Sequence, residues 1–118
     1  MEIESRLQGD VLVLAPEGKM AIGAGEACVR AAIREALAAG QRKLLVDMKG
    51  VTMLDSSGVG ELIGGYTSAV NKGGALKLAR LTPRVREILV ATQLTGILES
   101  YDDVPSALRS FASPRSPW

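Results

Sequence analysis

Three consecutive polar residues, Asp55, Ser56 and Ser57, are the ones in this sequence whose types and spacing could do chemistry. They follow the apolar run 51–54 and precede Gly58, at the point where a strand is expected to turn into a helix. The start of a helix offers free N–H groups and a partial positive charge, so it can bind an anion. A serine hydroxyl at such a turn could also act as a nucleophile. The segment therefore suggests either anion binding or nucleophilic catalysis.

The sequence lacks the residues that anion binding at a nucleotide loop or nucleophilic catalysis would require. The nucleotide-binding pattern GxxxxGK[ST] is absent, and GxGxxG fails because Ile63 stands where the third glycine should be. GxSxG is absent as well, and the sequence has no histidine to activate a serine. With one cysteine, Cys28, and no histidine, a zinc site has no ordinary ligands. We therefore expect no enzyme, no cofactor and no metal, with small-ligand or nucleotide binding as a minor alternative.

The elements that position this turn alternate between strands and helices. The pattern predicts a hairpin of residues 2–7 and 11–14, a polar loop over 16–25, a helix over 25–39, strands at 43–47 and 51–54, a helix over 57–71, a strand at 76–80, a helix that begins at Thr82-Pro83, a strand at 97–100 and a helix over 105–111. This alternation predicts one α/β domain over residues 1–112, with a mixed, mostly parallel sheet of about 4–5 strands and about 4 helices. Residues 113–118 are expected to form a disordered tail.

The helix after the turn has an unusual composition. Ser57 is expected to cap it, which leaves Ser56 just before the cap with its hydroxyl in solvent. On backbone grounds alone, Asp55, Ser56 and Ser57 could be turn and cap residues and nothing more. The same helix holds four glycines, although each interior glycine costs about 1 kcal/mol relative to alanine. Gly60 and Gly64 share one face, so we expect another backbone to approach there, from the domain's own sheet or from a partner protein.

The composition limits the class of partner. The 118 residues carry 14 Lys and Arg against 13 Asp and Glu, a net charge of +1, which is not the footprint of a nucleic-acid-binding protein. No apolar run approaches the roughly 20 residues of a membrane helix, and the polar start shows no signal peptide. The single cysteine fits a reducing compartment, so we expect a cytoplasmic protein. Five basic residues are expected to be either ordinary solvated charge or a contact surface for an acidic partner: Lys72, Lys77, Arg80, Arg84 and Arg86.

Three segments of the sequence are similar to a known family. They are Leu54-Asp55-Ser56-Ser57-Gly58-Val59-Gly60, with the strand 44–47 before it and Gly73-Gly74 after it, then 81–86, and then 93–97. Together they resemble the STAS domain of bacterial anti-sigma factor antagonists over residues 5–110. This resemblance implies a binding protein that captures an anti-sigma factor.

The resemblance also implies how such binding is controlled. In the family, the partner anti-sigma factor is a serine kinase that phosphorylates the serine after the aspartate, which here is Ser56. Phosphorylation releases the partner until a cognate phosphatase resets the switch. The residues implied to contact the partner are Asp55, Ser56, Ser57, Gly58, Val59, Gly60 and Glu61.

The sequence departs from the family at one position. Many phosphorylated members carry an acidic residue where this chain has Ala21, and the nearby Glu26 is out of register. The departure favours an alternative function: a STAS scaffold, or an accessory subunit of a signalling or lipid-transport complex, that is never phosphorylated. Weak homodimerisation stays open for either function.

Overall fold

The hairpin at the start of the chain forms as predicted, and the sheet is built onto it. In the computed structural model, which describes residues 1–112, β1 (Glu2–Gln8) pairs antiparallel with β2 (Val11–Met20). The tight turn is made at Gly9, whose φ of 63° favours glycine. The loop predicted from residue 16 is wrong, because β2 continues through Pro16 to Met20. The strand stays extended because its second half pairs with a further strand, with a register shift between Gly18 and Lys19.

Four more strands complete a mixed sheet. They are β3 (Lys43–Asp47), β4 (Val51–Leu54), β5 (Ala75–Ala79) and β6 (Ser100–Tyr101). Their order is β1-β2-β3-β5-β6, with β4 paired to the second half of β2, so the described chain has six strands, more than the expected four or five. All pairings after the hairpin are parallel. The last strand begins at Ser100 and not at residue 97, because a turn in which Leu98 N donates to Leu94 O occupies that segment.

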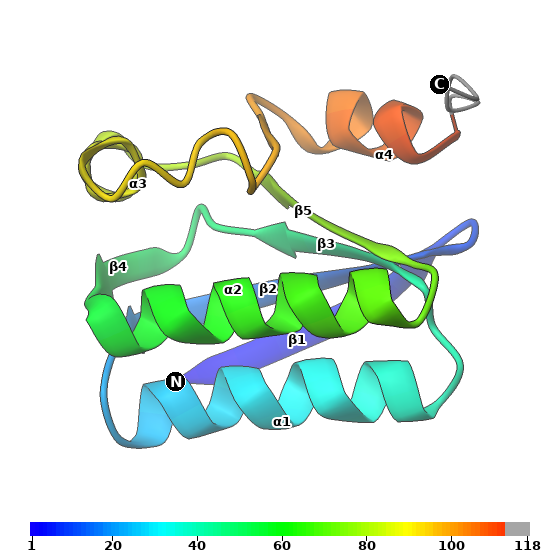
Figure 1. The fold of residues 1–118 in the computed structure, drawn as a ribbon, viewed down its shortest axis with the longest axis horizontal. Coiled ribbons are helices and arrows are strands. Elements are labelled where there is room, and N and C mark those ends of the chain that lie inside the picture. The colour runs from blue at the N-terminus through cyan, green and yellow to red at the C-terminus, as the bar shows by residue number, and fades with distance from the viewer. Residues whose placement is uncertain (113–118) are drawn as a thin grey trace.

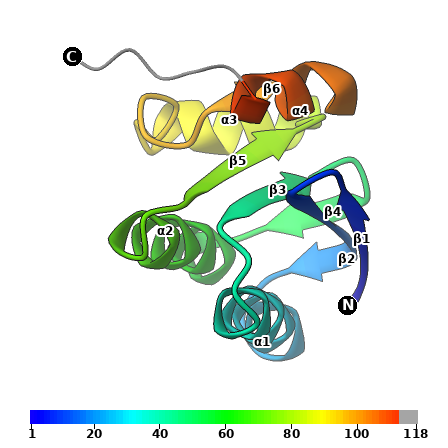
Figure 2. The same cartoon turned by 90° about the vertical axis from the view of Figure 1, so that its right-hand side faces the viewer.

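Four helices cover the two faces of this sheet. They are α1 (Ala24–Ala38), α2 (Ser56–Asn71), α3 (Pro83–Ala91) and α4 (Val104–Ala112). Helices α1 and α2 lie side by side on one face (Figure 1), and α4 packs on the opposite face (Figure 2). The predicted cap of α3 is confirmed, since Val85 N donates to Thr82 Oγ1 at 3.2 Å. The tail predicted at 113–118 lies outside the described residues.

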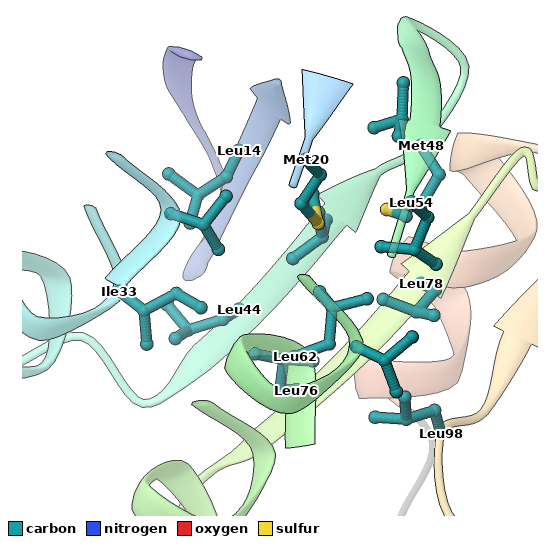
Figure 3. Close-up of a cluster of buried hydrophobic side chains, with 14 of the residues drawn as sticks. Leu14, Met20, Ile33, Leu44, Met48, Leu54, Leu62, Leu76, Leu78 and Leu98 are labelled. Carbon is teal, nitrogen blue, oxygen red and sulfur yellow. The ribbon is translucent and has the colours of Figure 1, made fainter. Parts of the chain in front are cut away.

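The core is aliphatic, as the low aromatic content requires. Figure 3 shows leucines and methionines from β2, β3, β4, β5 and α2 meeting in one cluster, joined by Ile33 of α1. Leu44, Leu62 and Met20 are fully buried there. No helix within residues 1–112 is long and apolar enough to cross a membrane. The core fixes α2 against the sheet and thereby positions its first turn.

One ion pair joins the carboxyl ends of β3 and β5. Asp47 is 3% exposed, and its carboxylate accepts hydrogen bonds from both Nε and Nη2 of Arg80. Burial alone would raise the pKa of Asp47, but the hydrogen bonds from Arg80 and from Lys49 N outweigh it, so the pKa is lowered. The buried carboxylate is therefore ionised and paired at neutral pH.

Candidate functional site

The first turn of α2 is held by Asp55. Its Oδ1 accepts a hydrogen bond from Gly58 N at 3.0 Å, which makes Asp55 the N-cap, and its Oδ2 accepts from Ile22 N at 2.9 Å. The prediction that Ser57 caps the helix is therefore wrong. A carboxylate has two oxygens and can satisfy both donors at once, which one hydroxyl oxygen does less well. The hydrogen bonds from Ile22 N and Gly58 N lower the pKa of Asp55, so it is ionised at neutral pH.

Ser56 is the first residue of α2 and is exposed. The sequence placed it in the turn before a Ser57 cap, which is wrong by two positions because the cap is Asp55. Its expected exposure to solvent is confirmed. Ser57 is the second helical residue and is half-buried, so the hydroxyl of Ser56 is the more accessible of the two. The structure thus places an exposed serine next in sequence to an ionised carboxylate.

The remaining predicted contact residues divide between the core and the surface. Gly58 and Val59 are buried, and a Cβ on Gly58 would lie 2.1 Å from the backbone oxygen of Met20. These two residues pack the start of the helix against the core. Gly60 is exposed, and half-buried Glu61 forms an ion pair with Arg30 at 2.8 Å. The surface of the site therefore consists of Asp55, Ser56, Ser57, Gly60 and Glu61.

Two exposed apolar side chains beside this turn were missed from the sequence. Ile22 is 77% exposed, and its own backbone N–H donates the hydrogen bond to Asp55 Oδ2. Met53 is 43% exposed on β4, the strand that leads into the turn. Met53 is exposed because only Val51 and Leu54 of β4 point into the core. Ala21 directly precedes Ile22, so the position that lacks an acidic residue is adjacent to the helix start.

Three of the five predicted basic residues are paired within the fold: Lys77 with Glu99, Arg80 with Asp47, and Arg86 with Asp102. Paired charge therefore accounts for these three. Lys72 and Arg84 are exposed and form no ion pair within residues 1–112. Within residues 1–112 no group of three His, Cys, Asp or Glu side chains could hold a metal ion.

The fold and this helix start define a class of protein. A hairpin followed by alternating helices and parallel strands, with an exposed serine after the aspartate cap of the second helix, describes a small α/β domain of the STAS type. Comparison with known families agrees, because the STAS domain pattern matches residues 2–107. The chain belongs to the STAS domain family.

Known relatives place it further within that family. The anti-sigma F factor antagonist of Paenibacillus polymyxa is 28% identical over 109 residues, which cover 92% of each chain. A Thermotoga maritima protein, provisionally named an anti-sigma factor antagonist, superposes with a TM-score of 0.88 at 22% identity and covers 94% of this chain and 95% of its own. The Bacillus cell fate determinant SpoIIAA in its phosphorylated form gives a TM-score of 0.71 at 18% identity, over 92% of this chain and 98% of its own. The names of the relatives support the anti-sigma factor antagonist group.

Proposed function

We propose that this chain is an anti-sigma factor antagonist that binds its anti-sigma factor through residues 55–61 and is switched off by phosphorylation of Ser56. The observation that carries the proposal is the exposed Ser56 at the first position of α2, next in sequence to the ionised Asp55. The partner is an anti-sigma factor that is also a serine kinase, and a cognate phosphatase restores the binding form. The chain itself acts by binding and catalyses no reaction.

The physical basis of the switch is charge at a covered surface. A phosphoryl group adds about −1.5 to −2 charges at one hydroxyl. Asp55 supplies a like charge next to it, and any partner that covers the turn must remove water from both groups. A penalty of about 3 kcal/mol would weaken binding about a hundredfold. Ile22 and Met53 are both exposed and would give the partner apolar contact area near the turn.

A second function is favoured by one observation. Ala21 precedes the residue that binds Asp55, so no acidic side chain stands at the position where many phosphorylated members have one. If that acid is needed for phosphoryl transfer, the chain would serve as a scaffold or accessory subunit that is never phosphorylated. The two functions share the binding surface and differ in the fate of Ser56.

The test is the intact mass of the protein purified from its native cells under growth and stress, with peptide mapping of residues 44–72. A single phosphate on Ser56 that changes with condition supports the switch. The matched variants Ser56→Ala and Ser57→Ala should separate the sites, because only the first removes the added mass. Phosphate on Ser57 would overturn the site assignment, and no phosphate under any condition would favour the scaffold function.

A further inference from the structure

The outward face of α2 is unusual for a helix in water. Its 16 residues contain one charged side chain, Glu61. A helix that faces solvent normally carries charged residues on its exposed side. Here the exposed positions are small or uncharged: Ser56, Gly60, Gly64, Thr67, Ser68, Val70 and Asn71. Such a face is typical of one that another molecule covers.

The glycines of α2 also indicate that another molecule covers this face. A Cβ on Gly58 would lie 2.1 Å from the backbone oxygen of Met20, so the fold itself requires glycine there. A Cβ on Gly65 would lie 2.7 Å from Ile33 Cδ1, so the fold accounts for a small residue at that position too. A Cβ on Gly64 would meet nothing within 4 Å. Alanine at this position would stabilise the helix at no steric cost inside the protein. The fold therefore gives no reason for glycine at position 64, whereas close approach of an outside backbone does.

Gly64 borders a groove between α1 and α2. The groove has a volume of about 440 Å³, and Ile33 and Leu37 of α1 contribute apolar side chains to its lining. Gly64, Gly65 and Ser68 line its α2 side. Figure 1 shows the two helices running side by side. The residues that line the groove come from both helices. The apolar lining and the missing side chain at position 64 leave room for a further helix to pack over the pair.

The charges along the groove are unbalanced. At one end Arg30 is neutralised, because it pairs with Glu26 at 2.7 Å and with Glu61 at 2.8 Å. Towards the other end lie Arg34 and Lys72, both exposed, and neither forms an ion pair with any residue in the described part of the chain. An occupant that carries carboxylates at this end would pair with two free cations. Charge complementarity therefore points to an acidic partner.

We propose that the α1–α2 groove is a second docking surface, which takes an acidic helix of a partner protein packed over Gly64 and paired with Arg34 and Lys72. A helix about 10 Å across matches the neutral exposed face of α2 from Gly64 to Asn71 better than a small anion does. The surface extends away from Ser56 towards the carboxyl end of α2, so it can be occupied whether or not that serine is phosphorylated. It goes beyond the proposed function, and its test does not require a kinase.

The test uses the full chain, labelled with ¹⁵N, and a helical peptide about 16 residues long with glutamates along one edge and alanines and leucines elsewhere. The matched probe carries lysine in place of every glutamate. The acidic peptide should shift the amide signals of 33–38 and 64–72 with a dissociation constant below about 1 mM, and affinity should fall with salt. The basic peptide should not bind. Failure of the acidic peptide to bind up to about 1 mM overturns the proposal.

Two pairs of variants make the test specific. Arg34→Glu with Lys72→Glu should lower the affinity at least about tenfold, whereas Lys49→Glu with Arg84→Glu, which reverses two exposed cations outside the groove, should not.

Gly64→Leu should fold, because the position faces open space, and should lower the affinity about tenfold. Ala31→Leu, on an exposed part of α1 outside the groove, is its control and should leave the affinity unchanged. Equal losses in both members of either pair overturn the proposal. Two other results also overturn the proposal. If sodium phosphate shifts the same amide signals with an affinity equal to that of the peptide, the groove is a small-anion site. If the shifts depend on protein concentration alone, the occupant is a second copy of this chain.

Discussion

Alanine substitutions at Gly58 and Gly60 should have opposite effects on stability, although the two residues lie in the same turn of α2. Both replace a glycine inside a helix, so both gain about 1 kcal/mol of helix propensity. They differ in what the new methyl group meets. At Gly58 the Cβ would stand 2.1 Å from Met20 O and 2.8 Å from Leu54 Cδ1, whereas at Gly60 it meets nothing within 4 Å.

The size of the difference follows from which atoms must move. The side chain of Leu54 can rotate, but Met20 O belongs to the backbone at the end of β2, which pairs with β4. Overpacking that shifts a backbone costs about 1–3 kcal/mol or more, and here it also moves the loop that binds Asp55. We expect Gly58→Ala to lower the free energy of unfolding by about 1–2 kcal/mol net. We expect Gly60→Ala to raise it by up to about 1 kcal/mol.

Urea denaturation of the three proteins, followed by far-ultraviolet circular dichroism, measures both changes with the linear extrapolation. The melting temperatures should separate by roughly 4 °C for each kcal/mol in a chain of this size. A Gly58→Ala protein as stable as the unmodified chain would refute the reasoning, because the close approach of α2 to β2 would then be dispensable. Loss of stability in Gly60→Ala would show that this face is already packed within the monomer.

Three further predictions concern the polar contacts of the fold. Arg80→Leu removes the ion pair of the Asp47 carboxylate, and urea titration at pH 7 should show a loss of about 2–3 kcal/mol in the free energy of unfolding. The loss is smaller than for a fully buried pair because the Arg80 side chain is 37% exposed. Burial then raises the carboxyl pKa, so the loss should shrink as the pH falls. In the unmodified chain the pKa of Asp47 is lowered, so the contribution of this carboxylate to stability is complete above roughly pH 4 and is lost as the pH falls through the pKa of the folded state. Acid titration followed by circular dichroism checks this loss. Lys77→Ala removes a cation 4.7 Å from the centroid of the Phe111 ring and its hydrogen bonds to Ser110, so amide exchange in α4 should rise about fivefold while α1 stays unchanged by hydrogen-exchange mass spectrometry.

The periodicity of the sequence predicted the helices and the opening hairpin well, because each buries one apolar stripe or face. It failed where pairing and not burial decides the structure. β2 continues through Pro16 because its second half finds β4, a partner that comes more than 30 residues later in the chain. No local pattern contains that information. The two-residue strand β6 shows the same limit, since only its pairing with β5 defines it.

The candidate site was predicted as a segment but not as an arrangement. The sequence indicated that residues 55–61 begin a helix, and it chose the wrong cap because Asp and Ser are both favoured there. The second hydrogen bond of Asp55, to Ile22 N, decides between them, and it joins residues 33 positions apart. Ile22 itself gave no signal, since one aliphatic residue in a polar loop is usually buried.

The position of Asp55 bears on how a switch at Ser56 would work. A phosphoryl group at the start of a helix is normally stabilised by the free N–H groups there. In this chain the Asp55 carboxylate already accepts from Gly58 N and from Ile22 N. A phosphoryl group on Ser56 would therefore face a fixed like charge and would be directed towards solvent. It would leave the fold intact and place its charge where a partner has to remove water from it. Such a switch would change the affinity for the partner far more than the stability of the domain.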